Sequence, residues 1–310
     1  MTFRIDGVEP AISIQQLTKR YRGGVMALNG VTLDVPAGCI YGFLGPNGAG
    51  KTTALRALVG MLHATSGKLR VLGLDPWRER VPLHERLGYL PSGMGVYEQM
   101  TGRDLLDYCA GLLHGPGRAS PLRARALEAL ALEESVLDRH IRSYSRGMRQ
   151  KVAIVQAVQH DPELLLLDEP SEGLDPLVQH SFYQLLRERR EQGRTVFFSS
   201  HTLSEVQALC DRIAIIRAGT LVVESTYEQL QGEHPRVVRI TTSTPREQVI
   251  TQLGDGWREV ASGDSDTIVL HASLPPVEIV RQLAQLSFDD VTIEQPSLED
   301  IFLSYYGEEG

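Results

Sequence analysis

The amino-acid sequence predicts an α/β domain with a largely parallel sheet and a helical insertion, followed by a small α+β domain. Apolar, β-rich runs alternate with helical patterns as far as about residue 231. Residues 164–167 are four consecutive leucines, as expected for a strand buried on both faces of a parallel sheet. After the segment QGEHPR (231–236) a second, shorter alternation begins. We therefore expect one domain over residues 1–231 and another over 232–310.

The strands and helices of the first domain are predicted from these runs in chain order. The expected strands are 11–17, 31–35, 39–45, 87–90, 164–168, 195–200 and 212–219. The expected helices are 51–62, 147–160, 176–193 and 202–211. Residues 102–137 contain no convincing strand and show helical patterns broken at HGPGRASP (114–121). We place a helical insertion at about 98–160.

The second domain is predicted from a β/α alternation over about 75 residues, and it is acidic. Strand-like runs at 236–242, 267–272 and 291–295 alternate with helical patterns at 245–253, 275–285 and 297–307. A ferredoxin-like arrangement fits this order. Residues 233–310 contain 14 Asp and Glu but only 5 Arg, a balance of −9, whereas the whole chain carries −8 and residues 1–232 carry +1. This charge disfavours nucleic acid as a direct partner. Dimerisation or regulation is one interpretation of this domain. The apolar stripe near its C-terminus, formed by Leu298, Ile301, Phe302 and Tyr305, favours the other interpretation, simple packing within the domain.

The composition is that of a cytosolic globular protein. The chain is 42% hydrophobic and 23% charged, and no run of 18 apolar residues is present to span a bilayer. The N-terminal residues lack the apolar stretch of a signal peptide. Three widely separated cysteines, Cys39, Cys109 and Cys210, indicate reduced thiols, without the spacing of a metal site.

A glycine-rich loop between the strand 39–45 and the helix 51–62 is the strongest functional signal. Its sequence, GPNGAGKT, fits the pattern of a phosphate-binding loop, or P-loop, in the required strand–loop–helix context. Glycines let successive backbone N–H groups face phosphate oxygens, and the helix N-terminus adds partial positive charge. Lys51 is expected to reach the β- and γ-phosphates, and the Thr52 hydroxyl to bind Mg²⁺. The loop residues are Gly45, Pro46, Asn47, Gly48, Ala49, Gly50, Lys51 and Thr52.

Two further strand ends carry groups suited to nucleotide hydrolysis. Asp168 and Glu169 follow the leucine strand, at the carboxyl edge where open α/β sheets bind ligands. Asp168 suits the Mg²⁺ shell, and Glu169 is placed to polarise the water that attacks the γ-phosphate. His201 follows the strand 195–200, where its imidazole could face that phosphate. Thr202 and Glu205 fit a capping box, so His201 could equally be a residue beside a helix cap.

A fourth segment, YSRGMRQ (144–150), precedes the leucine strand. Ser145 can cap the helix that begins there, and the amides around Gly147 could bind an anion. By itself the segment is equally compatible with an ordinary helix start.

The order of these motifs resembles the ATP-binding cassette (ABC) ATPases over about residues 10–230. The resemblance implies ATP and Mg²⁺ as ligands, hydrolysis of ATP, and two cassettes that pair head to tail as a homodimer or pseudo-dimer. By position, Tyr21 would stack on adenine, and the loop from Gly45 to Thr53 would hold the phosphates. Ser145 and Gly147 would cap the γ-phosphate bound by the partner, and Asp175 would link the two sites. Glu169 would be the catalytic base and His201 the γ-phosphate sensor. Thr52 and Asp168 would bind Mg²⁺.

The sequence departs from the family pattern at two places. The usual LSGGQ signature here is YSRGM, with Arg146 in place of the first glycine and Met148 in place of the glutamine. This variant, together with the tail PSLEDIFLSYYG, resembles the cassettes of ABC-2-type exporters. After LGYLP the family usually has a glutamine that reaches Mg²⁺ and the attacking water; here Ser92 occupies that position.

The expected function is an ATPase subunit that drives export through a separately encoded membrane permease, from the cytoplasmic face of the membrane. A soluble ABC ATPase of translation or DNA repair is the alternative. Such proteins usually carry two cassettes, long coiled coils or zinc-binding cysteines, and the sequence has none of these. A GTPase would need an N/T-K-x-D segment, which is also missing. The transported substrate, the permease and the consequence of Ser92 are not given by the sequence.

Overall fold

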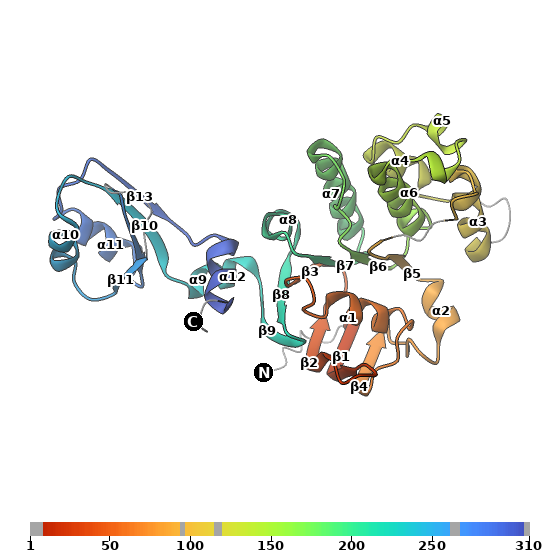
Figure 1. The fold of residues 1–310 in the computed structure, drawn as a ribbon, viewed down its shortest axis with the longest axis horizontal. Coiled ribbons are helices and arrows are strands. Elements are labelled where there is room, and N and C mark those ends of the chain that lie inside the picture. The colour runs from red at the N-terminus through yellow and green to blue at the C-terminus, as the bar shows by residue number, and fades with distance from the viewer. Residues whose placement is uncertain (1–8, 94–96, 115–119, 261–266, 307–310) are drawn as a thin grey trace. The chain divides into compact units, whose positions relative to one another are not determined.

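The computed structural model describes residues 9–93, 97–114, 120–260 and 267–306. By its internal contacts the chain divides into two compact units, Met1–Glu224 and Ser225–Gly310. The first unit contains a six-stranded sheet in the order β5-β6-β7-β3-β8-β9 (Figure 1). The pairs from β5 to β8 are parallel, as predicted. The strands are β3 (Ile40–Leu44), β5 (Leu87–Leu90), β6 (Leu164–Asp168), β7 (Thr195–Ser200), β8 (Arg212–Arg217) and β9 (Thr220–Ser225).

The two N-terminal strands belong to a separate antiparallel sheet, and so they do not extend the parallel one. Its order is β2-β1-β4, formed by β1 (Ile12–Arg20), β2 (Met26–Val35) and β4 (Ser66–Val71). The central strand β1 alternates between buried and more exposed residues in its first half, which is typical of a sheet with one face on the core. Helix α1 (Lys51–Leu58) lies between the two sheets, and its apolar side chains share one core with both (Figure 1).

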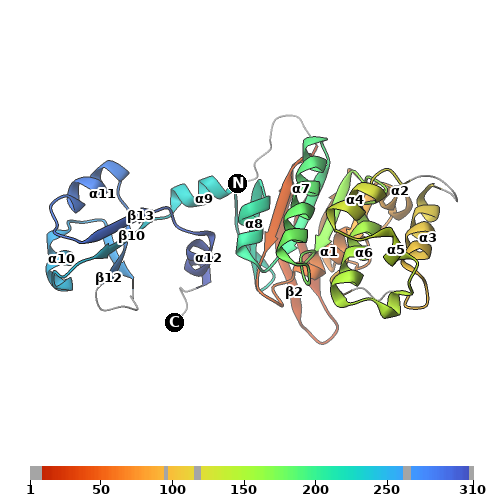
Figure 2. The same ribbon diagram turned by 90° about the horizontal axis from the view of Figure 1, so that it is seen from above.

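Helices α7 (Pro176–Glu191) and α8 (Leu203–Leu209) cover the opposite face of the large sheet, as Figure 2 shows. Because this sheet is covered on both faces, its central strands are fully buried. All five residues of β3 and of β6 are buried, and so are all six residues of β7. The run of leucines in β6 is explained by this position.

The insertion is helical in the part of it that the structure describes. Between residues 98 and 160 the described residues form helices and no extended strand. The helices are α3 (Gly102–His114), α4 (Arg123–Ala129), α5 (Glu134–Leu137) and α6 (Arg146–Val158), with a 3₁₀ turn at Ile141–Ser143. A short helix, α2 (Arg80–His84), precedes β5. Helix α6 packs against α3, α4 and β5 and so joins the insertion to the sheet.

The second unit is a four-stranded antiparallel sheet with its own hydrophobic core. Its βαββαβ order and its strand order β11-β12-β10-β13 give the ferredoxin-like arrangement that the sequence suggested. The elements are β10 (Arg236–Thr241), α10 (Arg246–Gln252), β11 (Trp257–Val260), β12 (Thr267–Ala272), α11 (Pro276–Leu283) and β13 (Asp290–Glu294).

The boundary between the units lies before residue 225, seven residues earlier than expected. The reason is helix α9 (Tyr227–Glu233), which belongs to the second unit because it packs against α12 (Leu298–Tyr306). Gln231 on α9 also donates a hydrogen bond to the carbonyl of Pro296. The segment QGEHPR, which looked like a linker, is the end of α9 and the start of β10.

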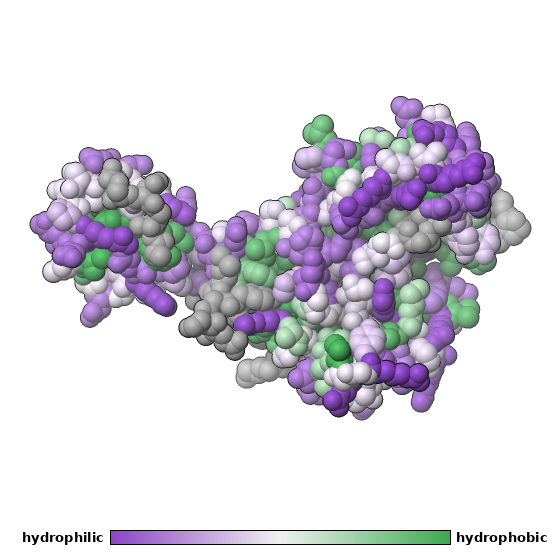
Figure 3. Space-filling model, in the orientation of Figure 1, coloured by the Kyte–Doolittle hydropathy of each residue, from purple (hydrophilic) through white to green (hydrophobic). Residues whose placement is uncertain are grey.

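The face of the molecule seen in Figure 3 is mostly hydrophilic, with hydrophobic side chains in small separate areas. Such scattered apolar residues are normal for a protein surface. Among the described residues, no helix has both the length and the apolar character needed to cross a bilayer. The three cysteines are free, and burial raises the pKa of Cys39 to about 12, which keeps this thiol protonated.

Candidate active site

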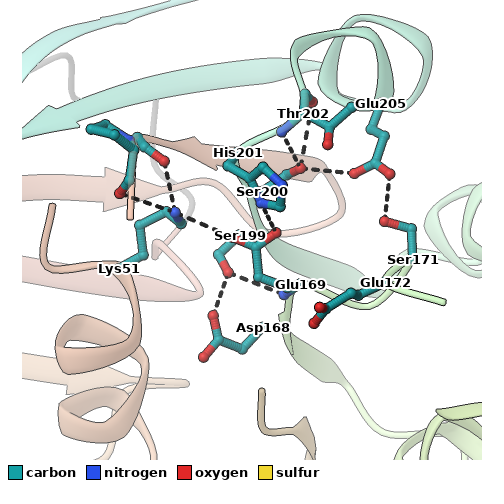
Figure 4. A network of polar contacts seen from close by, with 12 residues as sticks. Lys51, Asp168, Glu169, Ser171, Glu172, Ser199, Ser200, His201, Thr202 and Glu205 are labelled. Carbon is teal, nitrogen blue, oxygen red and sulfur yellow. Dashed lines mark hydrogen bonds and ion pairs between the residues drawn. The ribbon is translucent and has the colours of Figure 1, made fainter. Parts of the chain in front are cut away.

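Three segments that are distant in the sequence meet at the carboxyl edge of the large sheet. Strands β6, β7 and β3 are adjacent and parallel, with Asp168 paired to Ser199 and Leu44 paired to Ser200. The residues that follow these strands therefore leave the sheet at the same level. As a result Lys51, Asp168, Glu169 and His201 come together in one polar network (Figure 4).

The P-loop follows β3 and leads directly into α1, as the sequence predicts. Gly48 and Gly50 have φ angles of 83° and 111°, which favour glycine. A side chain at Gly50 would also place its Cβ 2.5 Å from the Ala27 carbonyl oxygen. The first turn of α1 has no side-chain cap, so its N–H groups suit an anionic ligand.

Lys51 is buried at the base of this loop, with 6% of its surface exposed. Its Nζ donates hydrogen bonds to the carbonyl oxygens of Gly45 at 2.6 Å and Pro46 at 3.3 Å. The same ammonium lies 3.2 Å from Oε1 of Glu169. Lys51 therefore joins the phosphate-binding loop to the end of β6.

Asp168 is fully buried, and two hydroxyl groups hold its carboxylate in place. Thr52 Oγ1 donates to Oδ2 at 2.8 Å, and Ser199 Oγ donates to Oδ1 at 2.6 Å. The pairing of Thr52 with Asp168 assembles two hard oxygen donors beside the P-loop, and such donors suit Mg²⁺. Ser199 was not predicted as a site residue, although a hydroxyl near a strand end, two residues before His201, is a signal that could have identified it.

Glu169 is the second carboxylate of the strand end and has an unusual backbone. Its φ angle of 52° is in the left-handed region, which is costly for a residue with a side chain. Its N–H donates to the carbonyl and hydroxyl oxygens of Ser199. Its carboxylate contacts two side chains, Lys51 and His201. Besides Lys51, Nδ1 of His201 lies 2.7 Å from Oε2. An ionised carboxylate only accepts hydrogen bonds, so Nδ1 of His201 carries the proton.

The structure contradicts the predicted capping box beside His201. Thr202 is the N-cap residue of α8, but its side chain makes no capping bond. Its N–H instead bonds to Ser200 Oγ at 2.8 Å. Glu205 does not reach back to the start of the helix, because its carboxylate is bound by Ser200, Ser171 and Gln179.

Tyr21 contacts the first turn of α1, and Ser92 follows a strand that pairs with β6. Tyr21 is partly exposed, and its hydroxyl lies 3.4 Å from Thr53 Oγ1 on the first turn of α1. Ser92 follows β5, which pairs with β6 in the register Leu90 to Leu167. The loop after Ser92 continues into residues 94–96, which lie outside the described residues.

The YSRGM segment forms a second cluster with the residues around Asp175. Ser145 is the N-cap of α6 and accepts the N–H of Met148 at 3.2 Å, as predicted. Arg146 forms an ion pair with Glu172, and a Cβ at Gly147 would lie 2.8 Å from the carbonyl oxygen of Gly173.

Asp175 caps α7 by accepting the N–H of Val178. Among the described residues, no hydrogen bond or ion pair joins Ser145, Gly147 or Asp175 to the P-loop residues 45–53. The segments 144–150 and 171–175 therefore contact one another, and their polar contacts in the described residues do not include the phosphate-binding loop.

The fold and the site together define a P-loop nucleotide hydrolase. Residues 28–172 match the family model of the ABC transporter domain. An ABC transporter ATP-binding protein of Synechocystis is 33% identical over 95% of this chain and 84% of its own length. The daunorubicin/doxorubicin resistance ATP-binding protein DrrA of Streptomyces peucetius is 33% identical over 96% and 92% of the two chains. The bacitracin transport ATP-binding protein BcrA of Enterococcus faecalis is 32% identical over 97% of both.

Solved structures show the same fold. The ATP-binding subunit of an ABC transporter superposes with a TM-score of 0.66 at 26% identity, over 72% of this chain and 92% of that one. A dimeric ATP-binding cassette with bound ADP and phosphate gives 0.63 at 23% identity, over 69% and 98%. The chain belongs to the ATP-binding proteins of ABC transporters, and its activity is ATP hydrolysis coupled to transport. The predicted family and fold are thereby confirmed.

Proposed function

We propose that two of these cassettes, as a homodimer or with a related chain, drive export through a separately encoded membrane permease. The observation that carries the pairing is the division of the site residues into two clusters. Lys51, Glu169 and His201 form one, whereas Ser145 and Gly147 lie in the other, without bonds to the P-loop among the described residues. A head-to-tail pair would bring the second cluster of one chain to the nucleotide of the other.

Each residue of the first cluster has a distinct role in this proposal. The N–H groups of the loop 45–53 and the Lys51 ammonium bind the phosphates, and Tyr21 contacts the base. Glu169 accepts the proton of the attacking water, and His201 orients Glu169 through their 2.7 Å contact and faces the γ-phosphate. Thr52 and Asp168 would hold Mg²⁺, which supplies charge neutralisation at the phosphates. Ser145, Gly147 and Asp175 complete the site from the partner.

Export as the direction of transport is supported by the names of the relatives. Besides the drug-resistance and bacitracin proteins, the Nod factor export ATP-binding protein I of Rhizobium meliloti is 31% identical over 98% of this chain. A location at the cytoplasmic face of the membrane follows from a permease partner. The soluble alternative in translation or DNA repair has no support from these relatives.

Purification of the tagged full-length chain from detergent-solubilised membranes tests the partner. We expect it to retain a multi-spanning membrane protein, since the cassette needs a permease to couple hydrolysis to transport. Mass spectrometry identifies the proteins that co-purify. An unrelated ATPase that carries the same tag is the control. Ribosomes or DNA in place of a membrane protein would contradict the proposal.

His201→Ala should lower kcat for ATP by about 100-fold, because Glu169 then loses the imidazole that orients it. The side chain is half exposed, so the fold should be unaffected. Phosphate release at saturating ATP measures the effect, and His180→Ala on the exposed side of α7 is the matched control. Equal turnover in both variants would exclude a role for His201 in hydrolysis.

A further inference from the structure

Glu205 is a buried carboxylate next to the active site, and it is not among the residues assigned above. It lies in the first turn of α8 with 9% of its surface exposed. Ser200 Oγ donates to Oε2 at 2.7 Å. Ser171 Oγ and Gln179 Nε2 both donate to Oε1, the latter at 2.8 Å. Figure 4 shows this carboxylate between the His201 loop and Ser171.

The three donors belong to three different parts of the site. Ser200 is the last residue of β7, directly before His201, and it also accepts the N–H of Thr202. Ser171 is two residues after Glu169, in the loop that leads to Asp175. Gln179 lies in the first turns of α7 and bonds to Tyr183 as well. One carboxylate therefore joins the loop of His201, the loop after Glu169 and the start of α7.

A carboxylate suits this junction because it accepts hydrogen bonds on both oxygens and donates none. Among the described residues its hydrogen-bond donors, Ser171, Gln179 and Ser200, are all neutral, so the carboxylate is held by hydrogen bonds and not by an opposing charge. Removing it would take an acceptor from all three donors: Gln179 would keep only its bond to Tyr183, and Ser200 only a 3.4 Å contact with the Thr202 carbonyl. The loss of these bonds would loosen the segments that carry the donors. The 2.7 Å contact between His201 and Glu169 depends on those two segments.

We propose that Glu205 is a positioning residue for ATP hydrolysis, which holds the loop of His201 and the loop after Glu169 in fixed register. The proposal rests on the roles given above to Glu169 and His201. Glu205 takes no part in nucleotide binding, because its partners lie outside the loop 45–53. It should therefore affect the chemical step and leave the binding of ATP unchanged.

The test compares kcat with KM in the full-length chain. Glu205→Gln keeps the size of the side chain but replaces one acceptor by a donor. We expect kcat to fall by about tenfold or more, since small misplacements of catalytic groups have effects of this order, with KM for ATP within about threefold of wild type. Glu191→Gln is the matched control, because it makes the same change in charge at an exposed residue at the end of α7; it should resemble wild type.

Ser171→Ala removes one of the hydrogen bonds to Glu205 from the side of the loop after Glu169, and it leaves α8 unchanged. It should also lower kcat, and the double variant with Glu205→Gln should be less impaired than the product of the single effects, because both changes disturb one network. Multiplicative effects would contradict a shared junction.

The outcomes separate this inference from the proposed function. Normal kcat in Glu205→Gln, while Glu169→Gln is inactive, would overturn the role of Glu205 alone. Normal kcat in both would overturn the assignment of Glu169 itself. A loss of ATP binding together with a lower melting temperature would make Glu205 a structural residue and would likewise overturn the inference.

Discussion

Glu169→Gln should abolish nearly all steady-state ATP hydrolysis while leaving ATP binding intact. Glutamine keeps the shape of the side chain but cannot accept the proton of the attacking water. General base catalysis contributes about 10²- to 10⁴-fold, so we expect kcat to fall by about 10³-fold, or about 4 kcal/mol of transition-state stabilisation. Lys51 and the loop amides, which bind the phosphates in our proposal, are unchanged.

The variant should also accumulate a dimer in the presence of ATP, because reopening of the paired cassettes depends on hydrolysis. Phosphate release measures kcat, equilibrium binding measures affinity for ATP, and size-exclusion chromatography with and without ATP measures the dimer. Glu85→Gln, at an exposed position just after α2, is a control for the loss of one negative charge. A Glu169→Gln chain that stays monomeric with ATP and hydrolyses it at the normal rate would contradict both the base and the pairing.

The candidate site was largely predictable because it is built from strand ends of a parallel sheet. Each motif could be assigned to the end of an apolar run, and parallel strands place their carboxyl ends at one edge. The contacts of Lys51 with Glu169 and of Thr52 with Asp168 agree with the placement predicted from these strand ends. The roles of these residues stay predictions until the variants are measured.

What the sequence could not provide were contacts that depend on three-dimensional packing. Glu205 fits a local capping pattern, and only the approach of Ser171 and Gln179 from other elements shows its actual partners. Strands β4 and β11 were not predicted, because their residues are mostly exposed or partly exposed and so lack an apolar run. The unit boundary was displaced because α9 packs on the C-terminal helix, which the local composition does not reveal.

Lys51→Ala should remove most of the affinity for ATP. The ammonium lies at the base of the P-loop, and in our proposal it contacts the β- and γ-phosphates. Loss of one partner of a buried charge pair in a binding site costs about 2 to 5 kcal/mol, so the dissociation constant for ATP should rise by about 100-fold or more. Hydrolysis should be undetectable at ATP concentrations that saturate the wild type.

Two controls distinguish loss of a phosphate ligand from damage to the fold. Lys68→Ala removes an exposed lysine of β4 and should bind ATP normally. Lys51→Arg keeps the charge, but the guanidinium is larger than the ammonium that donates to Gly45 at 2.6 Å, so affinity should still fall.

Thermal unfolding gives a second measurement of the Lys51→Ala variant, because Lys51 also forms an ion pair with Glu169. Without the ammonium, the Glu169 carboxylate keeps His201 as its partner, so thermal unfolding should change far less than ATP binding does. Melting curves recorded with and without ATP report both quantities on one sample, since a ligand that binds the folded state raises its melting temperature. Wild type should be stabilised by ATP and Lys51→Ala should not. Equal stabilisation of both chains by ATP would show that Lys51 is not a phosphate ligand.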